Sequence, residues 1–177
     1  MRARFIAPWK DSIEKPVIYH CVSRVVDRRF AFEAMEKERL RSYMRRYENF
    51  SGCRVLAYCF MCNHIHLLLE VPPMAAGGLS DEALLKRLRA LYTEQEVAAI
   101  ARELREYRQR RMENAARDLH ERYTYRMHDL SEFMKTLMQR FSSWFNRSQE
   151  RTGRLWEQRF KSVLVEDGPA ARAMAAY

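Results

Sequence analysis

The stretch Met61-Cys62-Asn63-His64-Ile65-His66-Leu67-Leu68-Leu69-Glu70-Val71-Pro72 organises the fold of this chain. Its apolar run, which stops at Pro72-Pro73, predicts a buried strand over residues 63–71. Side chains two residues apart on a strand share one face, so His64 and His66 point the same way. Neutral imidazole is a common ligand of divalent metals. The pair indicates half of a metal site, although a bare His-x-His pattern also occurs among ordinary core or edge residues.

The segments around this strand predict a sheet with helices between its strands. β-branched and apolar runs predict further strands at 16–26, 53–61 and 155–166. Amphipathic spacing predicts helices at 30–50 and 129–146. The join at Cys62-Asn63 is too short for a crossover, so it permits either a hairpin or one bent strand.

A charged helical block interrupts this pattern between residues 79 and 128. Ser80 is a suitable N-cap for a helix over 80–91, and Thr93 to Glu96 matches a capping box that opens a helix to about residue 120. Charges of both signs favour a solvated insertion over a site. A last helix is expected over 170–177, after Pro169.

The order of elements predicts a single domain over residues 1–177. We expect an α+β fold, a ferredoxin-like split β-α-β antiparallel sheet with helices on one face and a helical insertion. In such a sheet His64 and His66 lie on a central strand.

Composition favours a globular protein with an anionic partner. The chain has 177 residues, 47% of them hydrophobic, a net charge of +9 and a pI of about 9.6, which points first to nucleic acid. No apolar run reaches the length of a membrane span, and no secretory signal is recognisable. Cys59-x-x-Cys62 lacks a second cysteine pair, so the four cysteines are interpreted as buried thiols of a cytoplasmic, nucleoid-associated protein.

Basic residues interleave with aromatic ones between residues 135 and 161. This pattern suits phosphate contact combined with base stacking, although many of the aromatic residues, such as Phe141, fit a core role equally well. The residues predicted to bind DNA are Arg24, Arg147, Arg151, Arg154, Trp156, Arg159 and Lys161.

Three segments together resemble a known family. They are Tyr19-His20-Cys21-Val22-Ser23-Arg24, Met61-Cys62-Asn63-His64-Ile65-His66-Leu67-Leu68 and Gly153-Arg154-Leu155-Trp156-Glu157-Gln158-Arg159-Phe160-Lys161-Ser162. From about Pro16 onward the chain is similar to the single-tyrosine HUH transposases, in particular the REP-associated tyrosine transposases. The resemblance implies that His64 and His66 bind Mg²⁺ or Mn²⁺ and that the enzyme cleaves and rejoins single-stranded DNA or DNA hairpins through a 5′-phosphotyrosine. The sequence leaves the oligomeric state open, and a homodimer is one of the alternatives.

The same resemblance assigns the nucleophile to Tyr177, the last residue of the chain. The third metal ligand of the family lies one helical turn later, so we expect either a fragment or a truncated, inactive product. His20 matches a family position and is interpreted as structural, whereas Tyr123 and Tyr125 match none. The alternative function is a single-stranded or hairpin DNA-binding protein without chemistry. An unrelated His-x-His hydrolase would need a second histidine motif.

Overall fold

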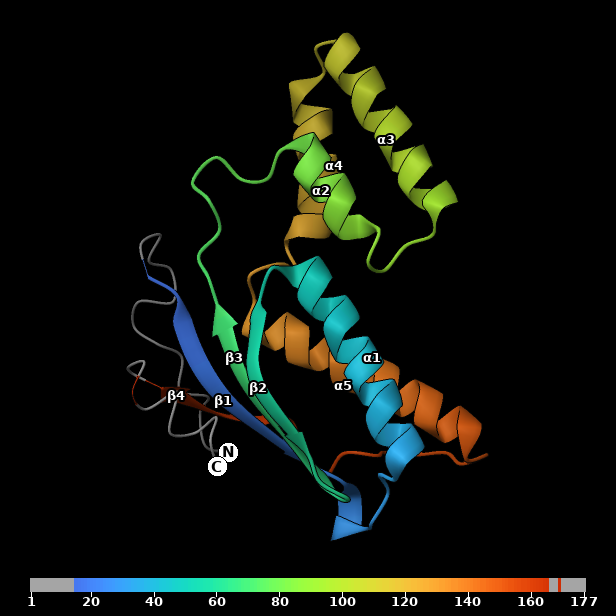
Figure 1. The fold of residues 1–177 in the computed structure, drawn as a ribbon. Helices are drawn as coiled ribbons and strands as arrows, with labels where there is room; N and C mark the ends of the chain where they lie inside the picture. Colours follow the sequence, from blue (N-terminus) through green and yellow to red (C-terminus); the bar gives the residue numbers. More distant parts are fainter. Residues whose placement is uncertain (1–14, 166–168, 170–177) are drawn as a thin grey trace.

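A four-stranded antiparallel sheet forms the centre of the molecule (Figure 1). The computed structural model describes residues 15–165 and residue 169. The strands are β1 (Val17–Arg24), β2 (Arg54–Phe60), β3 (His64–Val71) and β4 (Lys161–Val165), in the spatial order β2-β3-β1-β4. Because β3 lies between β1 and β2, the β1-α1-β2 connection is a split β-α-β unit. The predicted fold class is confirmed.

Two long helices cover one face of this sheet (Figure 1). They are α1 (Ala34–Ser51) and α5 (Leu130–Ser148), which also pack against each other. Alternate strand residues, such as Cys21, Leu67 and Leu69, point toward these helices and are fully buried. Phe141 of α5 meets them in the same apolar cluster. The opposite face of β1 and β3 is therefore the one on which His64 and His66 lie.

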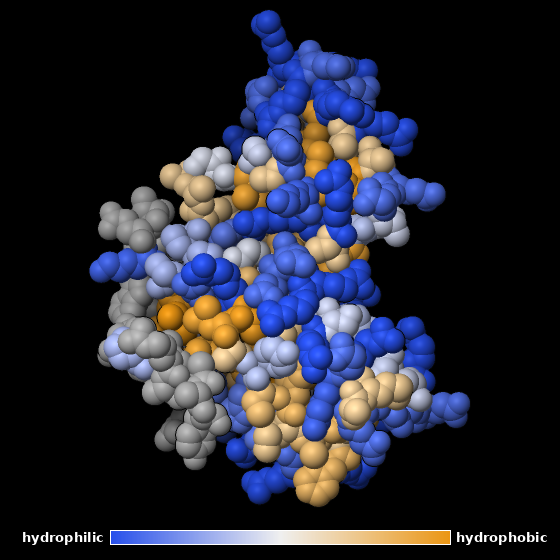
Figure 2. All heavy atoms as spheres, in the orientation of Figure 1, coloured by the Kyte–Doolittle hydropathy of each residue, from blue (hydrophilic) through white to orange (hydrophobic). Residues whose placement is uncertain are grey.

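Three further helices form the insertion between β3 and α5. They are α2 (Asp81–Leu88), α3 (Glu94–Gln109) and α4 (Glu113–Thr124). Leu84, Leu104 and Leu119 close a second apolar cluster, which Phe50 of α1 joins. The outer surface of this unit is predominantly hydrophilic (Figure 2). No helix within the described ranges is long and apolar enough to cross a membrane.

The connections differ from the prediction in two places, and at a third the structure selects one of the two alternatives that the sequence left open. The helix expected from residue 93 to about 120 is two helices, because the chain turns at Arg111 with φ 54°. Residues 62 and 63 form a hairpin turn, in which the Met61 amide donates to the His64 carbonyl over 2.9 Å. Of the strand expected over 155–166, the described residues form a regular strand only over β4. Trp156 forms an isolated bridge with Val25.

A short segment, η1 (Val26–Arg28), links β1 to α1 and takes an unusual backbone conformation. Asp27 and Arg28 have φ values of 57° and 54°, in the left-handed region. For residues with a Cβ this conformation costs on the order of 1 kcal/mol each. α1 begins at Ala34, later than the predicted residue 30, directly after Glu33, which forms a capping box with Glu36.

The cysteines divide into two pairs. Cys21 and Cys53 are buried, and burial raises the pKa of their thiols to about 12 and about 11. Cys59 and Cys62 are exposed, so the interpretation of all four as buried thiols is wrong for these two. No disulfide joins any of the four.

Candidate functional site

The candidate site begins with the alternation of side chains along β3. Ile65 and Leu67 are fully buried beneath the helices, whereas His64 and His66 lie on the other face and are half-buried. β3 is paired with β1 on one side and with β2 on the other. The two imidazoles therefore project from a strand that is hydrogen-bonded along both edges, as the sequence predicted.

The register of β1 brings a third histidine to this face. Val22 lies opposite His66 and His20 lies opposite Leu68, which makes His20 the diagonal neighbour of His66. The His20 Nε2 and His66 Nδ1 atoms are 3.0 Å apart, and their rings stack with centroids 5.1 Å apart. The ring centroids of His64 and His66 are 5.0 Å apart. Three imidazoles thus form one contiguous row.

The hydrogen bonds of Asn63 determine which nitrogen of His64 carries its proton. The Asn63 Nδ2 donates to the Arg28 carbonyl over 2.9 Å, so its Oδ1 must face His64. That oxygen lies 2.7 Å from the His64 Nδ1 and can only accept. The His64 Nδ1 is therefore the donor, and its Nε2 keeps a free lone pair. Fixing of the ligand tautomer by a neighbouring group is a common feature of metal-binding histidines.

The electrostatics of the row favour neutral imidazole. Burial lowers the pKa of His20, His64 and His66, and for the last two the nearby Arg24 guanidinium lowers it further. A ring that stays neutral near pH 7 can donate its lone pair to a metal.

The donor set fits a divalent metal in part. His64 offers Nε2, and His66 offers Nε2 when its Nδ1 donates to His20. Imidazole nitrogen suits Mn²⁺ better than Mg²⁺, which prefers oxygen ligands. Within the described residues there is no group of three or more histidine, cysteine, aspartate or glutamate side chains arranged to hold a metal. The described residues thus offer two imidazole nitrogens, those of His64 and His66, and no third histidine, cysteine, aspartate or glutamate group beside them that completes a metal-binding cluster.

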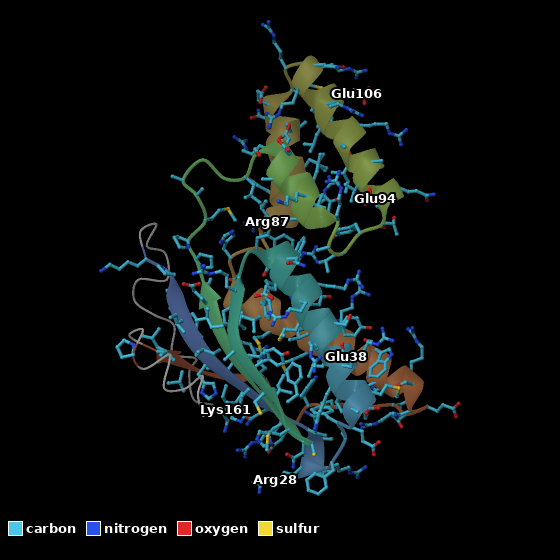
Figure 3. All side chains as sticks on the ribbon, in the orientation of Figure 1. Arg28, Glu38, Arg87, Glu94, Glu106 and Lys161 are labelled. Carbon is cyan, nitrogen blue, oxygen red and sulfur yellow. The ribbon has the colours of Figure 1, made fainter. Side chains whose placement is uncertain are left out.

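Two cations lie on the histidine face. Arg24 is exposed and lies opposite His64 in the β1–β3 register. Lys161 of β4 is exposed. It lies opposite Val22 of β1, which in turn lies opposite His66 of β3. Lys161 is labelled on β4 in Figure 3. An anion over the histidines would therefore meet positive charge on the side of β3 that carries β1 and β4.

The remaining predicted DNA contacts are distributed along the chain that leads from α5 to β4. Arg147 is exposed in the last turn of α5, and Arg154 and Arg159 are exposed in the connection that follows. Arg151 is half-buried, with its Cζ 5.6 Å from the Phe145 ring centroid, and it donates to the Arg154 carbonyl over 3.2 Å. The register does not place these four arginines on the histidine face.

Trp156 requires a correction. Its ring is 8% exposed and packs between Phe32 and Phe141, and its indole Nε1 donates to the Met138 carbonyl over 3.1 Å. A buried ring with a satisfied N–H offers no face to a base. Trp156 is a core residue, and the prediction that it contacts DNA is not retained.

Two residues of the site were not singled out for it by sequence reasoning. Asn63 was quoted only as part of a motif, and its role depends on the loop that it binds. His20 was interpreted as structural, and only the strand register reveals its contact with His66. Tyr177, the predicted nucleophile, lies outside the described residues.

The segment that carries the three histidines matches the model of a known protein family. Residues 14–78 match the family model described as "Transposase IS200 like". This is the segment from β1 to the end of β3 and a little beyond, and it contains His20, His64 and His66. The match supports a transposase-type, DNA-processing domain. No curated protein matches the chain.

Proposed function

We propose that this chain is a single-tyrosine HUH transposase of the REP-associated branch, which cleaves and rejoins single-stranded DNA at hairpin or repeat ends. The observation that carries the proposal is the pair His64 and His66 on a central strand, beside exposed cations. The match of the surrounding segment to the IS200-like transposases supports it. The whole chain is proposed to act as one domain.

Each residue of the site has a defined role in this proposal. His64 and His66 would hold Mg²⁺ or Mn²⁺, which when bound polarises the scissile phosphate and offsets charge in the transition state. Asn63 keeps the Nε2 of His64 deprotonated. Arg24 and Lys161 attract the phosphate backbone, and the exposed Arg147, Arg154 and Arg159 extend that attraction along the strand.

Tyr177 is proposed as the nucleophile. Its hydroxyl oxygen bonds to phosphorus and loses its proton, while the bond between phosphorus and the 3′ oxygen breaks. The 3′ oxygen leaves with a proton as a free hydroxyl, and the DNA fragment on the 3′ side of the nick stays joined to the enzyme through its 5′ phosphate, as a 5′-phosphotyrosine. Rejoining reverses these bonds with another 3′ hydroxyl, so no nucleotide cofactor is consumed.

Covalent capture of DNA tests this proposal. The full chain is incubated with Mn²⁺ and a hairpin oligonucleotide that is labelled on the 3′ side of the expected nick. We expect a denaturation-resistant adduct on a gel, which Tyr177→Phe abolishes and His66→Ala strongly reduces. Adduct formation that survives Tyr177→Phe would show that Tyr177 is not the nucleophile.

The second candidate is a hairpin DNA-binding protein without chemistry. It is favoured by the exposed Arg24 and Lys161, which suit phosphate binding irrespective of any metal. Its signature is salt-dependent hairpin binding by the same protein sample, with no adduct in Mn²⁺. That outcome would replace the transposase proposal.

A further inference from the structure

We propose that the loop Arg28–Phe30 binds an unpaired nucleobase of single-stranded DNA, with the Phe30 ring as the stacking surface. The inference rests on the proposed function, because it takes single-stranded DNA as the substrate. It adds a specific base contact close to the histidine row.

The exposure of Phe30 differs sharply from that of its neighbours. Phe30 is 85% exposed, the highest value among the exposed large hydrophobic residues of the described ranges. Phe32, two residues later, is 2% exposed and packs against Phe141 and Trp156. Val25, before the loop, is 1% exposed. The loop is thus anchored in the core at both ends while Phe30 projects into solvent. Hydrophobic residues gather at the lower end of the molecule in Figure 2, where Figure 1 places the end of β1 and the hairpin between β2 and β3.

Hydrogen bonds fix the loop to the hairpin turn that precedes β3. The amides of Ala31 and Phe32 both donate to the Cys62 carbonyl over 2.9 Å. The Asn63 side chain donates to the Arg28 carbonyl over 2.9 Å. The left-handed backbone of Asp27 and Arg28 is maintained within this frame. A ring on such a preorganised loop loses little conformational entropy when a base stacks on it.

The charges beside Phe30 match a nucleic acid backbone. Arg28 and Arg29 are both exposed, and Arg28 is labelled at the end of the molecule in Figure 3. Arg29 forms an ion pair with Asp27 at 3.5 Å, whereas no ion pair joins Arg28 to another residue of the described ranges. An aromatic face next to a cation is the arrangement that binds a stacked base and its phosphate. A base within a duplex has both faces covered, so the arrangement selects an unpaired one.

Asn63 connects this loop directly to the histidine row. The same side-chain amide that donates to the Arg28 carbonyl also contacts the His64 Nδ1. A base stacked on Phe30 would therefore belong to a nucleotide near the scissile phosphate, and it would help to place that phosphate.

Equilibrium binding of a single strand with and without bases tests the proposal. The probes are an oligothymidylate of about 20 nucleotides, longer than a typical single-domain site, and a fully abasic strand of the same length. The proteins are the full chain, Phe30→Ala, Phe30→Trp and the control Tyr125→Ala, which removes another exposed aromatic ring far along the chain. We expect Phe30→Ala to weaken oligothymidylate binding roughly tenfold, within the range for one stacked base. Phe30→Trp and Tyr125→Ala should bind as the unchanged chain does.

Two further readouts distinguish base stacking from phosphate contact and from a structural role of the ring. Phe30→Ala should leave the affinity for the abasic strand and the salt slope unchanged, because no phosphate contact is lost, whereas Arg28→Ala should make the slope shallower. Equal oligothymidylate affinity for Phe30→Ala and the unchanged chain would overturn the stacking site while leaving the proposed function intact. An equal loss on both strands would also overturn it, and would indicate an apolar or structural role. Absence of any single-strand binding by the unchanged chain would refute both proposals.

Discussion

At the scale of single residues, one amide side chain determines the tautomer of His64 in the candidate site. Asn63 has two functional ends, and the Arg28 carbonyl can accept only from its nitrogen. The oxygen is thereby directed at His64, whose Nε2 is left free. The tautomer of His64 follows from the donor and acceptor capacities of these groups.

Removal of Asn63 should therefore weaken metal binding without unfolding the protein. We expect Asn63→Ala to reduce Mn²⁺ affinity about tenfold, at the lower end of the effect of losing an outer-shell partner. Calorimetric titration measures it. The matched control is Asn146→Ala, which removes an Asn donor to the Gly153 carbonyl elsewhere in the fold. If both variants bind Mn²⁺ equally well, the role assigned to Asn63 is wrong.

His128 provides a pH-dependent contribution to stability away from the site. Its Nδ1 lies 2.8 Å from the Pro72 carbonyl and its Nε2 lies 3.1 Å from an Arg87 nitrogen, so the ring accepts from a cation. Burial, the largest cause, and the charge of Arg87 lower the pKa of His128 below 6.5. The unfolded chain then binds more protons than the folded one just below pH 6.5, and stability falls as pH falls through this range.

Urea unfolding at about pH 7.5 and about pH 5 should show this loss of stability. His128→Asn should reduce the pH dependence, because Asn does not titrate and tolerates the positive φ of 52° at this position. Some dependence should persist, since the pKa values of His20, His64 and His66 are also lowered. An unchanged pH dependence in His128→Asn would exclude this residue as a contributor.

At the scale of elements, the sequence predicts most helices and strands, but it does not predict every helix end or the register between strands. The central strand and the two covering helices followed from apolar spacing and Pro72-Pro73, whereas the join at Cys62-Asn63 left a hairpin and one bent strand as alternatives. The break between α3 and α4 did not, because no glycine or proline marks it. Arg111 adopts a left-handed conformation, and the Met112 amide bonds back to the Tyr107 carbonyl.

The candidate site was predictable to the same limited extent. Residues on one strand, such as His64 and His66, share a face by periodicity alone. The addition of His20 requires the pairing register between β1 and β3, which a single sequence does not specify. Trp156 was misinterpreted because aromatic residues among arginines have the same composition whether the rings are buried or exposed.

The junction between α1 and β2 gives a stability prediction at this scale. Gly52 ends α1 with φ 76°, and a Cβ there would collide with the Arg87 guanidinium and the His128 ring. Arg87 is labelled where α2 meets the main body in Figure 3. We expect Gly52→Ala to destabilise the protein by about 1–3 kcal/mol, from backbone strain and this contact together.

The control for this prediction is Gly77→Ala. Gly77 has no positive φ and no heavy atom within 4 Å of a built Cβ, so its replacement should be neutral or slightly stabilising. Chemical denaturation of both variants measures the difference. Equal stability of the two would contradict the argument from strain and close contact.

At the scale of the whole molecule, the distribution of positive charge matters more than its sum. The net charge of +9 is spread over the chain, but the insertion carries many charges of both signs and the α5–β4 connection is mainly basic. Only cations that contact the DNA phosphates release the counterions bound to the DNA. Net charge alone should therefore not determine affinity.

Two triple variants with the same net charge test this distinction. Replacing Arg24, Arg154 and Arg159 by Gln should reduce the slope of log affinity against log salt by about 2, given roughly 0.7 per phosphate contact on a single strand. Replacing the exposed insertion residues Arg102, Arg105 and Arg122 by Gln should leave the slope almost unchanged. Filter binding at several salt concentrations measures both. Similar slopes for the two variants would indicate non-specific charge attraction.

The position of β3 inside the sheet has a consequence for how metal binding and unfolding are coupled. Because β3 is paired along both edges, its amides are expected to exchange with solvent only when the sheet as a whole opens. The two imidazoles are therefore held on one face of the sheet only in the globally folded state. Any ion that they bind will therefore stabilise the entire domain against unfolding. Its concentration will shift the melting temperature of the whole sheet.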